Sequence, residues 1–324
     1  MPQGAKSSSN TLAIYWTDPG TGALTANGST GTGAYPYAIA MTPNGLFAYV
    51  TNLVSGTVNS YSINTTTGAV GMTGNSVGSV NPYGIAMDPL GRFVWVANFS
   101  ANTVSAYTIN GSTGQIVAAG SPVPTGTHPY DVAAHPSGNY VYVTNESGNS
   151  VSAFSVNTSS GQLTQIGTPA VGTVAGPHGL VVDPSGHFVY VAEAGGDTVT
   201  VFSINAGTGA LARLGFTRAG SLPNAVAVHP NGQFVYAANQ SSNNVSVFSI
   251  NSSTGLLTAV GSPVAAGSGP TALKVNAAGT YLYVANLVSN TTSTYSINSG
   301  TGVLTPLGAA TATGSGPQGI AITP

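Results

Sequence analysis

A phrase that begins with proline returns at nearly even intervals along the chain. It reads PYAIAMTPNGLFAYVTN from Pro36, PYGIAMDPLGRFVWVAN from Pro82, PYDVAAHPSGNYVYVTN from Pro129, PHGLVVDPSGHFVYVAE from Pro177, PNAVAVHPNGQFVYAAN from Pro223 and PTALKVNAAGTYLYVAN from Pro270, and a shorter copy, PQGIAITP, starts at Pro317. Successive prolines are 46, 47, 48, 46, 47 and 47 residues apart. A fixed period of this size is typical of solenoids and propellers, in which each repeat is one supersecondary unit.

Each repeat predicts four short β-strands. In the second repeat these are YGIAMD, FVWVAN, TVSAYTIN and GQIVAAG, and turn sequences separate them. DPLG, HPSG and HPNG place Pro and Gly where tight hairpins need them. No segment shows a sustained helical period. Four antiparallel strands repeated without helices predict the blades of an all-β propeller.

The two ends of the chain together supply one further blade. NTLAIYWTDPGTGALT, near the N-terminus, matches the third and fourth strands of a repeat, and PQGIAITP matches a first strand, which leaves Met1 to Lys6 for the second. A blade shared between the termini closes the ring and removes exposed strand edges. We therefore predict one seven-bladed domain over residues 1–324, with four-stranded antiparallel blades near 36–81, 82–128, 129–176, 177–222, 223–269 and 270–316 and a shared blade from 1–35 and 317–324.

The first strand of each repeat predicts how blades pack. Its third and fifth positions are small, as in Gly84 and Ala86, and its fourth and sixth are large, as in Ile85 and Met87. Alternate side chains point to opposite faces of a strand, so a bulky face of one blade should meet a small face of the next.

Composition excludes several partners and bears on where the protein is located. Charged residues make up 4% of the chain, and the net charge is −2 with five Lys plus Arg, so the basic surface that nucleic acid requires is missing. No apolar run approaches the ~20 residues of a membrane span. The absence of Cys excludes disulfides and Cys-bound zinc. A surface of Ser, Thr, Asn and Gly favours an extracellular or periplasmic protein, although the first residues contain no signal peptide.

The tetrapeptide YVTN, at Tyr49 to Asn52 and again at Tyr142 to Asn145, resembles the repeat of the YVTN and lactonase-type seven-bladed propellers, which include 6-phosphogluconolactonase-like proteins. The resemblance covers essentially the whole chain. GPHGLVVDPSGHFVYVAEAGGDTVTVF, from Gly176, is similar to the family phrase HxHSVxxDPSGRFxxVxDLGxDRVxVY. It aligns His178 with the second histidine and aligns Glu193 and Asp197 with the paired acids.

The next blade departs from the family pattern. The family phrase GPRHLxFHPxGxFxYVxNE carries an Arg, a His and a Glu that the resemblance implies as the lactone-opening centre. Here the matching residues are Asn224, Ala225 and Gln240, so all three titratable groups are absent. Lactone opening needs a general base or an activated water and donors for the developing oxyanion. A phosphosugar would also need a cation, and the candidates are Arg218 and Lys274.

Residues that break the columns of the repeat mark a candidate site over the third and fourth blades. Strand starts and loops should bring them to one mouth of the central channel, except that Lys274 should line the channel. The expected ligand-binding residues are Tyr130, Asp131, His128, Glu146, Asp197, Arg218, Asn224 and Lys274, and the expected catalytic pair is His178 and Glu193. A metal is possible because His and carboxylates are competent ligands, although no spacing names an ion. The alternative is ordinary loop polarity, and the same hydrogen-bonding role is expected for Asp88, His135, Asp183 and His229 in turns of the opposite face.

Two functions stay open at this point. In the first, the protein is a binding or structural propeller that takes a small molecule, sugar or lactone at the channel mouth, or a protein partner or second copy through its low-charge surface. In the second, it is a lactonase whose centre is rebuilt around His178 and Glu193. The missing Arg, His and Glu favour the first.

Overall fold

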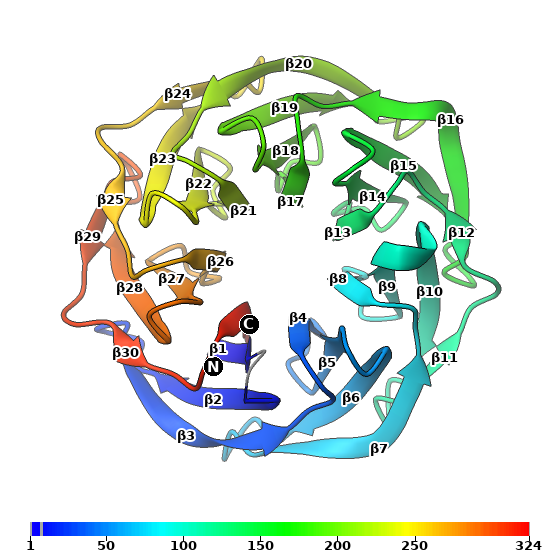
Figure 1. Cartoon of the computed structure of the whole chain (residues 1–324), viewed down its shortest axis with the longest axis horizontal. Coiled ribbons are helices and arrows are strands. Elements are labelled where there is room, and N and C mark those ends of the chain that lie inside the picture. Colours follow the sequence, from blue (N-terminus) through cyan, green and yellow to red (C-terminus); the bar gives the residue numbers. More distant parts are fainter. Residues whose placement is uncertain (1, 7–8, 324) are drawn as a thin grey trace.

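The computed structural model describes residues 2–6 and 9–323. Seven antiparallel sheets lie in a ring around a central channel, and each sheet runs outward from an inner strand to an outer one (Figure 1). The predicted all-β, seven-bladed propeller is confirmed. The one helical element among the described residues is η1 (Phe99–Ala101), a single 3-10 turn.

The six complete blades repeat one plan, in which the strands follow one another from the channel to the rim. The first three consist of β4 (Pro36–Met41), β5 (Phe47–Asn52), β6 (Thr57–Ile63) and β7 (Val70–Gly78); β8 (Pro82–Met87), β9 (Phe93–Asn98), β10 (Thr103–Ile109), β11 (Ile116–Ala118) and β12 (Val123–Pro124); and β13 (Pro129–Ala134), β14 (Tyr140–Asn145), β15 (Ser150–Val156) and β16 (Leu163–Gly172).

The next three blades follow the same order. They consist of β17 (Pro177–Val182), β18 (Phe188–Glu193), β19 (Thr198–Ile204) and β20 (Leu211–Arg218); β21 (Pro223–Val228), β22 (Phe234–Asn239), β23 (Asn244–Ile250), β24 (Leu257–Ala259) and β25 (Val264–Ala265); and β26 (Pro270–Val275), β27 (Tyr281–Asn286), β28 (Thr291–Ile297), β29 (Leu304–Pro306) and β30 (Thr311–Ala312). Where five strands are counted, the outer strand is split, and both pieces pair with the same third strand.

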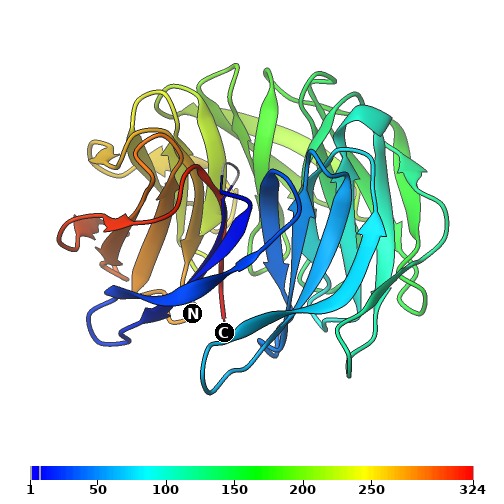
Figure 2. The same ribbon diagram turned by 60° about the horizontal axis from the view of Figure 1, so that its bottom comes forward.

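The seventh blade joins the two ends of the chain, as the sequence predicts. Its order is β3 (Leu24–Gly31), β2 (Thr11–Thr17), β1 (Pro2–Lys6) and β31 (Pro317–Ile322). Gly4 of β1 pairs with Ala13 on one side and with Ile320 on the other. Figure 2 shows the N- and C-terminal strands side by side within this blade. Backbone pairing between the first and last segments therefore closes the ring.

The core lies between blades. Every residue of β5, β9, β18, β22 and β27 is buried, because each of these second strands packs against a neighbouring blade on both faces. The large-against-small packing is also as predicted: Ala227 of β21 and Leu273 of β26 share one apolar cluster. A Cβ on Gly84 would lie 2.5 Å from the Asp131 Cα of the next blade, so only glycine fits there.

A buried aromatic side chain in the second strand of each of the six complete blades fastens that blade to the next. Its polar atom donates to a glycine carbonyl in the hairpin between the third and fourth strands of the following blade. These pairs are Tyr49 with Gly114, Trp95 with Gly161, Tyr142 with Gly209, Tyr190 with Gly255, Tyr236 with Gly302 and Tyr283 with Gly22. The Tyr of the YVTN phrase is therefore a structural residue at the blade interface.

Candidate functional site

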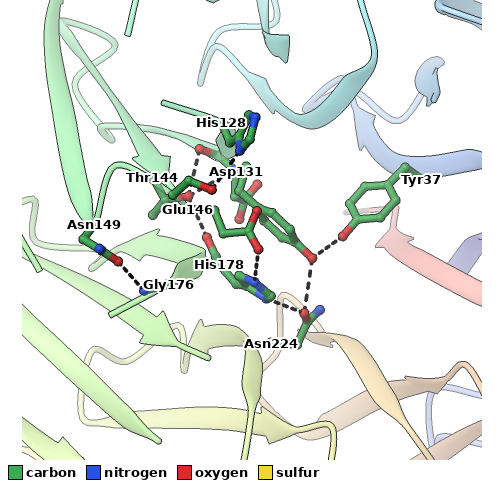
Figure 3. Close-up of polar contacts among 11 residues, drawn as sticks. Tyr37, His128, Asp131, Thr144, Glu146, Asn149, Gly176, His178 and Asn224 are labelled. Atoms are coloured by element: carbon green, nitrogen blue, oxygen red, sulfur yellow. Dashed lines mark hydrogen bonds and ion pairs between the residues drawn. The ribbon is translucent and has the colours of Figure 1, made fainter. Parts of the chain in front are cut away.

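The residue that follows the first proline of each inner strand lies at one mouth of the channel. In chain order these residues are Tyr37, Tyr83, Tyr130, His178, Asn224, Thr271 and Gln318. The rings of Tyr37 and Tyr83 are 4.4 Å apart, and those of Tyr83 and Tyr130 are 5.2 Å apart. The hydroxyls of Tyr37 and Tyr130 are hydrogen-bonded to each other over the channel (Figure 3). Burial raises the pKa of Tyr37 well above its ordinary value, so this pair stays neutral.

His178 is the centre of the polar contacts at this mouth. Its ring lies parallel to that of Tyr130, with centroids 4.1 Å apart. Its Nδ1 is 2.8 Å from Asn224 Oδ1, and Asn224 Nδ2 donates to the Thr271 carbonyl at 2.7 Å. Because the amide nitrogen faces Thr271, its oxygen faces His178, so Nδ1 carries the proton. The second ring nitrogen, Nε2, is 3.4 Å from Glu146 Oε1 (Figure 3): it carries the lone pair when the ring is neutral and donates to the carboxylate when the ring is protonated.

Glu146 comes to His178 from the loop after β14. Its backbone amide donates to the His128 carbonyl at 2.8 Å. The His128 ring stacks on Phe99 at 4.4 Å, and its Nδ1 lies 2.7 Å from the Ser147 hydroxyl. His128 thus positions the loop that carries Glu146. The Glu146 side chain is 33% exposed and that of His178 is 14% exposed, so solvent and a small ligand can contact both.

Glu193 does not belong to the cluster around His178. It occupies the column of Asn52, Asn98, Asn145, Asn239 and Asn286 at the end of the second strand, and it is fully buried. Its Oε2 accepts from the amides of Val174 and Ala175, the latter at 2.8 Å. In the preceding blade, Asn145 Oδ1 accepts from the equivalent amide of Gly126 at 3.0 Å. The carboxylate that faces His178 is consequently Glu146, whereas Glu193 holds the linker between two blades.

Asp197 has the same kind of role. It has a φ of 53° and accepts from the Leu222 amide at 2.8 Å through Oδ1. Five asparagines at the equivalent positions, all with left-handed backbone, bind the amide before the first proline of the next blade: Asn10, Asn102, Asn149, Asn243 and Asn290. The acidic pair of the fourth blade therefore replaces two structural asparagines. The repeat columns contain this signal, which a comparison with the family phrase alone misses.

Asp131 lies inside the channel, just below the tyrosine pair. Its two carboxylate oxygens accept from the amides of Val132 at 2.9 Å and of Leu180, in the next blade, at 3.1 Å. Burial raises its pKa to about 6, while those two amides and the charge of Lys274 oppose the shift. Asp131 thus links two inner strands and places a negative charge in the channel wall.

Lys274 lines the same channel from β26, as predicted. The cavity has a volume of about 490 Å³ and extends from Tyr37 and Tyr130 to Pro89, in a hairpin of the opposite face. The Lys274 side chain is exposed to this space, yet the ring of inner strands encloses it on all sides. That enclosure lowers its pKa, and the charge of Asp131 opposes the effect.

The remaining charged residues contribute little to the mouth. Arg218, expected at the mouth, instead ends the outermost strand β20, where it pairs with Thr198. Arg92 pairs with Asp88 at 2.9 Å. On the opposite face, Asp88, His135, Asp183 and His229 all bind turn backbone, as expected for structural residues.

Neither a metal-binding cluster nor a membrane-spanning helix occurs among the described residues. No group of three or more His, Cys, Asp or Glu side chains is arranged to hold a metal ion in that part of the chain. No helix within residues 2–6 and 9–323 is long and apolar enough to cross a membrane.

The fold and the residues at the channel mouth define the class of protein. It is a seven-bladed β-propeller with a polar cluster at the mouth, over the third to fifth blades. The family profile described as lactonase, seven-bladed β-propeller matches residues 4–86, 88–270 and 225–324. The chain belongs to this lactonase family. None of the curated proteins compared with the chain matches it significantly.

Solved structures share the whole fold. A candidate 6-phosphogluconolactonase from Bacteroides uniformis is 22% identical, with a TM-score of 0.89 over 99% of this chain and 98% of the other. A candidate 6-phosphogluconolactonase from Bacteroides fragilis is 21% identical, with a TM-score of 0.86 over 99% and 96%. The periplasmic gluconolactonase of Pseudomonas aeruginosa is 18% identical, with a TM-score of 0.85 over 99% and 98%. At these identities the likeness concerns the fold.

Proposed function

We propose that the protein is a hydrolase of uncharged lactones, with His178 and Glu146 as its catalytic residues. The observation that carries the proposal is the orientation of His178. Its Nδ1 donates to Asn224, so the basic Nε2 lies beside Glu146 Oε1, 3.4 Å away. An imidazole lone pair and a carboxylate on one small open surface form a site for a water molecule, which either group can deprotonate.

The reaction follows from this arrangement. A water held by Nε2 and the Glu146 carboxylate attacks the lactone carbonyl carbon and gives its proton to Nε2. The negative charge of Glu146 stabilises the resulting imidazolium. The tetrahedral intermediate collapses with cleavage of the ring C–O bond, and the leaving alkoxide takes the proton from Nε2. The product is an open hydroxy acid, and the imidazole returns to its starting state.

The charge distribution supports an uncharged substrate. Four of the described side chains are cations. Arg92 is bound to Asp88, and Lys274 lies inside the channel. The other two, Arg213 and Arg218, belong to the outer strand β20. The polar cluster at the mouth therefore presents a carboxylate and no Arg or Lys to a phosphate group. The name of the Pseudomonas relative, a gluconolactonase, is consistent with a substrate that lacks phosphate.

The aromatic rings at this mouth stack on one another. The Tyr130 ring is stacked on His178, and Phe99 is stacked between Tyr83 and His128. Since these faces are used within the protein, recognition of a substrate would depend on Glu146, His178 and Asn224.

The test is a lactone-hydrolysis assay with gluconolactone and its 6-phosphate. We expect the wild type to accelerate hydrolysis of the uncharged lactone above its spontaneous rate, with a preference for it over the phosphate. His178→Gln and Glu146→Gln should each lower kcat/KM about 10²–10⁴-fold. Glu193→Gln and His135→Gln, which change similar groups outside the cluster, serve as matched controls. Wild-type protein that binds the lactone without hydrolysing it would instead favour a binding propeller.

A further inference from the structure

The channel below the tyrosine pair adjoins the proposed catalytic surface and shares Tyr130 and Asn224 with it, whereas His178 and Glu146 lie outside its lining. The hydrogen-bonded hydroxyls of Tyr37 and Tyr130 lie between the two, and the cavity continues past them to Pro89 on the opposite face. Its walls are the inner strands, and they are mostly aliphatic, with Met41, Met87 and Val228 toward the far end. The side chains that line it are mainly aliphatic, and the free backbone edges of the inner strands add polar surface, so the channel can receive a small molecule that has both apolar and polar parts.

Lys274 is the residue in this wall that the fold does not explain. The equivalent positions of the other inner strands hold Ala40, Ala86, Ala133, Val181, Ala227 and Ala321. No hydrogen bond or ion pair joins the Lys274 ammonium to the described residues, so its three N–H groups face the cavity. Because the side chain is exposed to the channel, an anionic partner can reach this ammonium.

Asp131 does not fill that role. It faces the channel from β13, and its oxygens are used by the amides of Val132 and Leu180. It lies beyond salt-bridge distance of Lys274, although each charge affects the pKa of the other. The channel therefore contains one ammonium group available to a ligand, that of Lys274, and one nearby negative charge, that of Asp131.

From this geometry we infer that the channel interior binds a small monocarboxylate with an apolar tail, whose carboxylate pairs with Lys274 and whose chain lies along the aliphatic walls. A single positive charge next to Asp131 suits a monoanion better than a dianion such as phosphate, because the second negative charge would be repelled without compensation. The hydrocarbon chain would displace water from apolar wall surface. The inference does not depend on the proposed lactonase activity.

The chain has two lysines, Lys6 and Lys274, which makes a direct readout possible. Reductive ¹³C-methylation keeps the charge and gives each lysine its own methyl signal, assigned with Lys274→Met. At neutral pH, hexanoate should shift the Lys274 signal saturably and leave the Lys6 signal in place. Affinity should rise about threefold to fourfold for each methylene from acetate through butyrate to hexanoate, and inorganic phosphate should bind more weakly than hexanoate.

Variants provide independent measurements by calorimetry. Lys274→Met should abolish hexanoate binding, Asp131→Asn should strengthen it several-fold, and Glu146→Gln at the catalytic surface should leave it unchanged. If Lys274→Met fails to fold, the methyl signals of the wild type and the Asp131→Asn measurement still decide. An unmoved Lys274 signal, equal shifts at both lysines, binding that survives Lys274→Met, or tighter binding of phosphate than of hexanoate would each overturn the inference.

Discussion

The hydroxyl of Tyr283 donates to the carbonyl of Gly22 at 3.2 Å, across 261 residues of sequence. The same bond joins Tyr142 to Gly209, so the last complete blade is fastened to the shared blade as each of the other complete blades is to the one that follows it. Ring closure thus uses the side-chain contact of the repeat as well as the pairing of β1 with β31.

Removing this hydroxyl should weaken the closure selectively. We expect Tyr283→Phe to lower the free energy of unfolding by about 1 kcal/mol, the net contribution of one hydrogen bond. Amide hydrogen exchange in β1 to β3 should also become faster, since the bond joins this blade to its neighbour. Tyr142→Phe is the matched control, with a similar loss of stability and no faster exchange at the termini. Equal exchange at the termini in both variants would argue against a special role of Tyr283.

Gly179 should tolerate no larger residue. A Cβ there would lie 2.8 Å from Ala225 Cα and 2.9 Å from the Asn224 carbonyl oxygen, so Gly179→Ala would push β17 away from β21. We expect a loss of about 1–3 kcal/mol by chemical denaturation, the usual cost of overpacking. A weakened His178–Asn224 contact should accompany this loss. Gly172→Ala is the control, because nothing lies within 4 Å of its added methyl group. Equal stability of the two variants would contradict the packing argument.

Glu193 should be replaceable by the residue of its own column. Glu193→Asn restores the side chain found in five other blades and should keep near wild-type stability, because an amide oxygen can accept from the Val174 amide. Glu193→Ala leaves two part-buried amides without this acceptor and should cost about 1–3 kcal/mol. Thermal unfolding measures both. Should Glu193→Asn abolish lactone hydrolysis in a folded protein, Glu193 would have a role in catalysis after all.

Asp131 predicts a pH dependence of stability. Its pKa is about 6 in the folded protein, above the ~3.9 of an unfolded chain. Between these values the unfolded chain loses the proton while the folded protein keeps it, so the free energy of unfolding falls as pH rises. The fall should be on the order of 2 kcal/mol and be missing in Asp131→Asn. Urea unfolding of both proteins at pH about 4 and about 7 tests this. Buried Glu193 titrates in both proteins and cancels, so equal pH slopes would refute the assignment.

The sequence by itself determined the fold. Strand period, turn residues and the 46- to 48-residue spacing of prolines are local, and their repetition leaves a ring of blades as the arrangement that buries both faces of each second strand. The same repetition defined the residue columns in which Glu193 and Asp197 take the positions of structural asparagines.

Only the tertiary structure decided which titratable groups meet. Glu146 and His178 come from different blades, and so do Asp131 and Lys274. The two glutamates occupy different positions of the repeat. Glu193 ends strand β18 and meets the amides of Val174 and Ala175, whereas Glu146 lies in the loop after β14 and meets His178. The contact of Glu146 with His178 joins chain segments far apart in sequence, which local patterns do not encode.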